Sequence, residues 1–226
     1  MNTTRHSTAA YVLPFVLFLG GLLLVPLVKK IGGESLVFSR PEFWIYPLQT
    51  LVCGAVLIAF RKYYSFDFSR GIFWAAAAGL FSLAIWISPQ WLFGAPPRMT
   101  GFNPELLRPD AWIYRLTVAA RFLRLVIVVP FMEEIFWRGF LMRFLIRERF
   151  EEVPFGEYRL FSFSVTALLF GLEHSGPDLI PGILTGVIYN ALAVRTRSLG
   201  ACVLAHAVTN LGLGIYIMET KQWGFW

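Results

Sequence analysis

Residues 130–139 read PFMEEIFWRG and set two adjacent glutamates and an arginine into one of the most apolar parts of the chain. The surrounding run, residues 116–142, is long enough to cross a bilayer, where a charged side chain is costly. Ionisable residues in such a span usually face the protein interior or a water-filled cavity. The stretch therefore predicts a membrane helix that turns a polar site toward the inside of a helical bundle.

The composition of the whole chain also indicates a membrane protein. Of the 226 residues, 57% are hydrophobic and only 15% are charged, a balance unlike that of a water-soluble domain of this size. The net charge of +6 comes from Lys and Arg in short clusters at the ends of apolar runs. No basic stripe or nucleic-acid motif is present, so we expect the bilayer and no nucleic acid as partner.

The apolar segments predict an all-α fold, a polytopic transmembrane helical bundle with about seven spans. The fifth and sixth segments are short for a crossing and can be tilted, re-entrant or buried in the bundle. The first is too long for a secretory signal and has no clear cleavage site, so we expect it to be retained. The segments are residues 9–28, 43–60, 71–93, 116–142, 158–173, 178–194 and 199–218.

Residues 94–111 form the longest predicted loop, because four prolines forbid a continuous helix there. Cys53 and Cys202 lie in apolar surroundings, which predicts buried thiols and gives no disulfide framework or CxxC metal site.

The two glutamates of the opening stretch are expected to differ in environment. Glu134 and Arg138 are four residues apart on one helix face, so the arginine can neutralise that carboxylate. Glu133 lies about 100° away around the helix, with no cation of its own. A buried carboxylate without a countercharge is a stronger base than one in water, which makes Glu133 the candidate base. Pro130 predicts a kink that opens a cavity there. The alternative is a structural role for both glutamates: Glu134 forms a buried ion pair with Arg138, and Glu133 accepts a hydrogen bond from a neighbouring donor.

Two of the three histidines lie in or beside apolar segments. His174 follows the fifth segment, and His206 lies inside the seventh, four residues before Asn210. His206 and Asn210 therefore project from one helix face, where they can offer two neutral hydrogen-bond donors to an oxyanion. The alternatives are a satisfied core histidine and an asparagine that bonds a neighbouring helix.

Three motifs in these segments resemble those of the CAAX prenyl protease family, also called the CPBP intramembrane proteases. They are EExxxR at residues 133–138, FxxxH at residues 170–174 and HxxxN at residues 206–210. The motifs occur in the family's order on three membrane segments, and the resemblance covers roughly residues 126–213.

The resemblance implies an intramembrane endopeptidase, a hydrolase that cuts a peptide bond of a membrane-associated protein or peptide, with lipidated, CaaX-like proteins as one class of substrate. Glu133 with His174 would activate the attacking water. His206 with Asn210 would stabilise the tetrahedral oxyanion. An alternative from another class is a non-catalytic membrane scaffold or immunity-type protein that uses the same polar cluster to hold helices together.

Glu134 and Arg138 would, by the same resemblance, shape the site and hold substrate. Glu173 departs from the family pattern, in which an apolar or aromatic residue is common, and its helical position about 100° from His174 allows it to reach the surface. The short chain resembles a compact prokaryotic-type member, which implies a multi-pass protein of the prokaryotic inner membrane.

We expect no cofactor and a metal-free mechanism. The alternative is zinc, for which Glu133, His174 and His206 would supply three nitrogen and oxygen ligands. We expect one integral-membrane domain over residues 1–226, with the N-terminal spans in residues 1–93 and the CAAX-protease-like core in the C-terminal helices, residues 111–218.

Overall fold

The computed structural model describes residues 2–33, 35–174 and 176–226, and this part of the chain contains helices and loops but no strand. The predicted all-α fold is confirmed, and every one of the seven predicted apolar segments is helical. The helices are α1 (Asn2–Ile31), α2 (Leu36–Ser39), α3 (Glu42–Ala59), α4 (Ile72–Phe93), α5 (Ala111–Leu123), α6 (Val129–Glu134), α7 (Met142–Phe144), α8 (Leu160–Glu173), α9 (Leu179–Thr196) and α10 (Leu199–Thr220).

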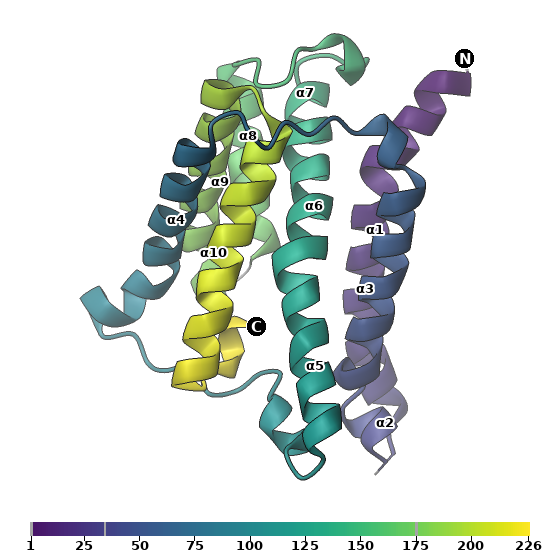
Figure 1. Ribbon diagram of the computed structural model, residues 1–226, viewed down its shortest axis with the longest axis vertical. Coiled ribbons are helices and arrows are strands. Elements are labelled where there is room, and N and C mark those ends of the chain that lie inside the picture. Colours follow the sequence, from purple (N-terminus) through teal and green to yellow (C-terminus); the bar gives the residue numbers. More distant parts are fainter. Residues whose placement is uncertain (1, 34, 175) are drawn as a thin grey trace.

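Helices α5, α6 and α7 continue one another and form a central helix that stands between two groups of helices (Figure 1). On one side α1 packs against α3, and on the other α8 packs against α9 and α10 against α4. The central helix contacts both groups, so residues on its different faces meet different neighbours.

Five of the described helices are long and apolar enough to cross a membrane: α1, α3, α4, α9 and α10. The central helix carries several charged residues, and α8 has only 14 residues. The total of seven crossings therefore stays a prediction.

The outer surface is strongly apolar, since Phe73, Trp91 and Phe93 are 72%, 75% and 81% exposed. Apolar surface of this kind is suited to lipid and marks a membrane-facing exterior.

The central helix is widened on both sides of the glutamate pair. Asp110 caps its start by accepting bonds from the N–H groups of Trp112 and Ile113. Residues Arg124–Val128 and Ile135–Leu141 are π-helical. The N–H of Val129 bonds the Arg124 carbonyl five residues back, and the next residue, Pro130, has no N–H to donate. The predicted distortion at Pro130 thus takes the form of a π-helical segment just before Glu133.

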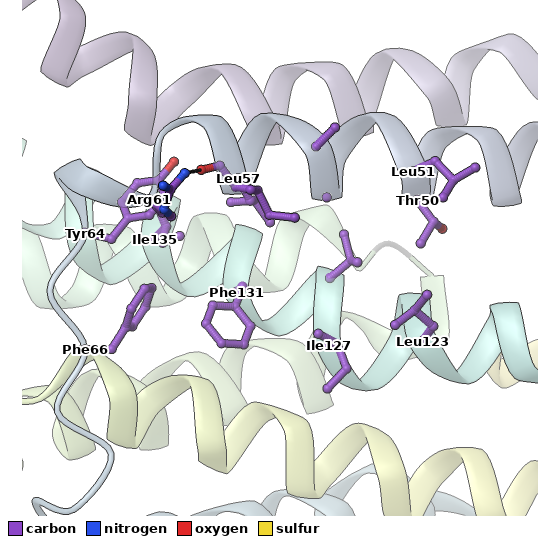
Figure 2. Close-up of a pocket in the computed structure, with 14 residues that line it drawn as sticks. Thr50, Leu51, Leu57, Arg61, Tyr64, Phe66, Leu123, Ile127, Phe131 and Ile135 are labelled. Atoms are coloured by element: carbon purple, nitrogen blue, oxygen red, sulfur yellow. Dashed lines mark hydrogen bonds between the residues drawn. The ribbon is translucent and has the colours of Figure 1, made fainter.

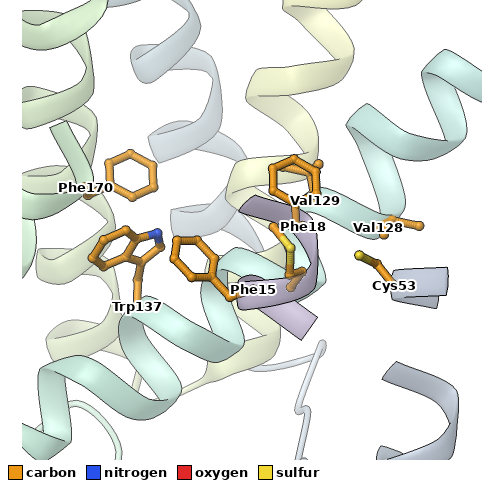
Figure 3. Packing of buried hydrophobic residues seen from close by; sticks show 8 residues of the cluster. Phe15, Phe18, Cys53, Val128, Val129, Trp137 and Phe170 are labelled. Atoms are coloured by element: carbon orange, nitrogen blue, oxygen red, sulfur yellow. The ribbon is translucent and has the colours of Figure 1, made fainter. Parts of the chain in front are cut away.

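Aromatic side chains from α1, α8 and the central helix pack together near the middle of the central helix (Figure 3). Phe15 of α1 stacks on Phe136 with ring centroids 4.0 Å apart, and Trp137 meets Phe170 of α8 edge-on at 5.9 Å. Cys53 is completely buried in the same cluster. Both cysteines are free and buried, as predicted.

Close packing of α8 on α9 depends on a glycine. A Cβ atom on Gly171 would lie only 2.7 Å from the backbone nitrogen of Ile183, so any larger residue would push the helices apart. Gly171 lies three residues before His174, and this close approach fixes where that histidine emerges from α8.

Candidate active site

A cavity of about 270 Å³ opens between the central helix and both groups of helices. Its walls include all four residues predicted to carry the chemistry: Glu133 of α6, His174 at the end of α8, and His206 and Asn210 of α10. Three separate helices thus direct a carboxyl group, two imidazoles and an amide into one space.

Glu133 is buried and lacks a full set of partners. It is only 4% exposed, and its Oε2 atom has no hydrogen-bond partner within the part of the chain that the structure describes. Buried polar atoms are normally bonded, and an exception at a cavity wall marks a place for water or a ligand. Glu133 is therefore free to bind a water molecule in the cavity.

Glu134 and Arg138 form the ion pair that their spacing predicted. The Nη1 atom of Arg138 lies 3.0 Å from Oε1 of Glu134, and both side chains are fully buried. The same guanidinium donates to the Asn190 side-chain oxygen at 3.0 Å and to the Gly186 carbonyl at 3.3 Å. Among the described residues neither member of the pair lines the cavity, so the pair lies behind the cavity wall, and a direct contact with substrate stays a prediction.

His206 contacts this ion pair, and the sequence did not predict that contact. Its Nδ1 atom lies 2.9 Å from Oε1 of Glu134. Because Arg138 donates to the same oxygen, Glu134 is the acceptor and the Nδ1–H of His206 is the donor. The expectation of a neutral His206 donor therefore needs correction. With Nδ1–H bonded to Glu134, the remaining Nε2 can donate to an oxyanion only when both ring nitrogens are protonated.

His174 is held in one orientation by its own helix. Its Nδ1 atom lies 2.8 Å from the Phe170 carbonyl oxygen, which can only accept. In the neutral ring this bond places the proton on Nδ1 and leaves Nε2 as an acceptor. The ring packs edge-on against Trp86 at 5.3 Å and tilted against Phe170 at 5.0 Å.

Asn210 is positioned by the distortion at Pro130. Its Nδ2 atom donates to the Leu125 carbonyl at 2.9 Å. In the π-helical register that carbonyl would accept from the residue five positions later, which is Pro130, and proline has no N–H. The asparagine side chain takes the place of the missing donor, and its second N–H remains available.

Glu173 differs from its predicted position. It is half-buried and lines the cavity, with its Oε2 atom buried and without a hydrogen-bond partner in the described chain. The expected 100° offset from His174 assumed that both residues are helical. Helix α8 ends at Glu173, and His174 has φ −99° and ψ 60°, so the two side chains enter the same space.

Two further groups were not predicted. Asn190 anchors Arg138 from α9, and Arg121 and Arg124 of the central helix line the cavity. The sequence shows the two arginines as extra charges in an apolar run, and this pattern could have indicated that they face the interior of the bundle.

The zinc alternative requires Glu133, His174 and His206 to lie close enough to share one ion. Within residues 2–33, 35–174 and 176–226 no three His, Cys, Asp or Glu side chains are grouped as a metal ion requires. Glu133, His174 and His206 share the cavity but do not form such a group, and a metal-free mechanism stays a prediction.

A second hollow, of about 590 Å³, lies on another face of the central helix, between it and α3 (Figure 2). Its lining is almost entirely aliphatic and aromatic, including Leu57, Ile127 and Phe131, with Arg61 at one end. Among the described residues that line it there is no carboxyl or imidazole group, unlike the smaller cavity.

The fold and the cavity together define a class of protein: a helical membrane protein with a glutamate, two histidines and an asparagine gathered in an internal polar site. Residues 115–212 match the sequence model of the family described as Type II CAAX prenyl endopeptidase Rce1-like. This segment contains all three motifs, and the match confirms the predicted resemblance to CAAX prenyl proteases over these residues. No curated protein and no solved structure was found to match the chain.

Proposed function

We propose that this protein is an intramembrane endopeptidase that hydrolyses a peptide bond of a membrane-associated protein with a water molecule activated by Glu133. The observation that carries the proposal is the convergence of Glu133, His174, His206 and Asn210 on one cavity. The family match supports a protease of the CAAX prenyl endopeptidase class.

In the first step, water lies between the Glu133 carboxylate and Nε2 of His174. Glu133 removes one proton while the water oxygen attacks the carbonyl carbon of the substrate. The Nδ1–H bond of His174 to the Phe170 carbonyl keeps Nε2 as the acceptor. The carbonyl π electrons move to oxygen and form a tetrahedral oxyanion.

Protonated His206 and the second N–H of Asn210 stabilise this oxyanion. The Glu134 carboxylate accepts a hydrogen bond from Nδ1 of the imidazolium and shares its negative charge between His206 and Arg138. A preorganised donor of this kind is typically worth about 2.7–4 kcal/mol in the transition state. The ion pair of Glu134 and Arg138 thus acts through His206.

The second step breaks the carbon–nitrogen bond. The oxyanion electrons re-form the carbonyl, and the proton held by Glu133 passes to the departing nitrogen. The products are one peptide that ends in a new carboxyl group and one that begins with a new amine. No cofactor is required in this scheme.

The proposed substrates are membrane-anchored proteins or peptides, with lipidated, CaaX-like proteins as one class. The proposed location is the inner membrane of a prokaryotic cell. A non-catalytic scaffold would keep the same polar cluster but release no product.

Product analysis in labelled water tests the proposal. The purified protein, reconstituted in vesicles, is incubated in ¹⁸O water with a panel of membrane-anchored peptides, both prenylated and unmodified. We expect two fragments whose masses add up to the parent peptide plus one labelled water, with the label in the new carboxyl group. The same preparation of His174→Gln controls for a contaminating protease and should give no fragments. An intact panel after incubation with the unsubstituted protein would contradict hydrolysis and favour a scaffold.

A further inference from the structure

Two arginines line the same cavity and have no part in the mechanism above. Arg121 lies in the last turn of α5, and Arg124 begins the π-helical segment. They are only 8% and 6% exposed. Aromatic rings flank both: the Cζ atom of Arg121 lies 4.9 Å from the Phe102 ring centroid and 5.2 Å from that of Trp226, and Cζ of Arg124 lies 4.2 Å from that of Tyr46.

Neither guanidinium makes a hydrogen bond or an ion pair with any residue in 2–33, 35–174 or 176–226. Nε and Nη1 of Arg121 and Nη1 of Arg124 are buried without a hydrogen-bond partner. The contrast with Arg138 is direct, since that equally buried guanidinium has a carboxylate and two further acceptors.

A buried charge without a partner costs several kcal/mol, and buried charges in proteins are normally paired. Stacking on aromatic rings is favourable but does not supply an acceptor. Two such cations three residues apart on one cavity wall therefore mark a site for an anion. A planar guanidinium fork matches the oxygens of a carboxylate or a phosphate.

The charges along the cavity indicate what kind of anion fits. Arg121 and Arg124 of the central helix make one part of the cavity wall basic, whereas Glu133 of the same helix and Glu173 of α8 make another part acidic. A suitable ligand is thus anionic at one end and neutral where it meets Glu133. Nine residues separate Arg124 from Glu133, which is about 13 Å along a helix. An extended peptide of about four residues covers that span.

We propose that Arg121 and Arg124 form an anion subsite that binds the free C-terminal carboxylate of the peptide substrate, while neutral peptide bonds lie beside Glu133. The proposal rests on the proposed hydrolase function for the identity of the ligand. It makes the two arginines specificity-determining residues, because a peptide without a free terminus near the cut bond leaves them unpaired.

A binding experiment tests the subsite without requiring hydrolysis. The full chain carrying Glu133→Gln is solubilised in detergent, and the dissociation constants of N-acetyl-trileucine with a free carboxylate and of its C-terminal amide are compared. We expect the acid to bind at least about tenfold more tightly, because the amide forfeits a charge-assisted bond. This preference should disappear in Arg121→Gln and in Arg124→Gln. It should persist in the matched control Arg115→Gln, whose side chain is exposed on the same helix.

Equal binding of the acid and the amide to the chain that keeps both arginines overturns the proposal, whether or not the glutamine variants fold.

A lipid phosphate is the competing occupant. If phosphatidylglycerol, but not phosphatidylcholine, stabilises the protein in an arginine-dependent way and the two peptides bind alike, the subsite belongs to lipid. If the acid preference is found but no peptide in the cleavage panel is cut, the subsite stands and the proposed hydrolysis fails. If peptides are cut but the acid is not preferred over the amide, hydrolysis stands and the proposed subsite fails.

Discussion

Arg138 satisfies three acceptors at once, from its own helix and from α9. Its guanidinium also packs over the Phe170 ring, with Cζ 4.6 Å from the ring centroid. Glu134 depends on it, since the remaining partner of that carboxylate is the imidazole of His206. The arginine of the motif is therefore a structural support of the site.

Replacement of Arg138 by alanine should be strongly destabilising. It leaves the Glu134 carboxylate buried beside His206 without its cation, and loss of one partner of a buried pair costs about 3–5 kcal/mol. Unfolding of the detergent-solubilised protein by increasing SDS measures this loss. Arg147→Ala is the matched control, because its ion pair with Glu152 is exposed and is worth no more than about 1 kcal/mol. Similar losses for both variants would contradict the supporting role of Arg138.

Residue spacing predicted contacts within a helix but not those between helices. The bond of Glu134 to Arg138 follows from their separation of four residues, and it is present. The bonds of His206 to Glu134 and of Asn190 to Arg138 join residues 72 and 52 positions apart, and no local pattern encodes them. Glu173 was misplaced for a related reason, because a helical angle was applied across the end of a helix.

At the scale of elements, the apolar runs predicted the helices well, and their edges differ from those of the structure by a few residues at most sites. The π-helical segments around the glutamate pair were not predicted beyond a kink at Pro130. Hydropathy does not distinguish an α turn from a wider one. The missing N–H of Pro130 does indicate which carbonyl is left without a donor, and Asn210 occupies that carbonyl.

Pro130→Ala should therefore separate stability from activity. The new N–H can bond the Leu125 carbonyl and displace the Asn210 side chain. We expect the free energy of unfolding to rise by about 1 kcal/mol, the net worth of one hydrogen bond, and turnover to fall about 10²-fold, the lower end of the range for losing an oxyanion donor. SDS unfolding and single-turnover cleavage measure the two effects.

Pro26→Ala is the control, since Pro26 also lies inside a helix but is exposed on α1. It should gain stability and keep full turnover. Unchanged turnover in Pro130→Ala would show that Asn210 does not depend on the π-helical carbonyl.

At the scale of the whole molecule, the chain places its polar groups inside and its apolar groups outside. Five helices are long and apolar enough to cross a bilayer, while the charged central helix is sheltered between the two groups of helices (Figure 1). Only a bundle of several helices can hide Arg121, Arg124, Glu133, Glu134 and Arg138 from lipid. The number of crossings cannot be read from hydropathy alone, because burial inside the bundle allows a segment to be polar or short.

The rate of Glu133→Gln shows whether Glu133 removes the proton of the attacking water. Glutamine keeps the size of the side chain but cannot accept that proton, so we expect the purified variant to cleave a validated membrane peptide at no more than background rate while it remains folded. Glu148→Gln, in an exposed position outside the cavity, should retain the parent rate. Cleavage by Glu133→Gln at the parent rate would contradict the account.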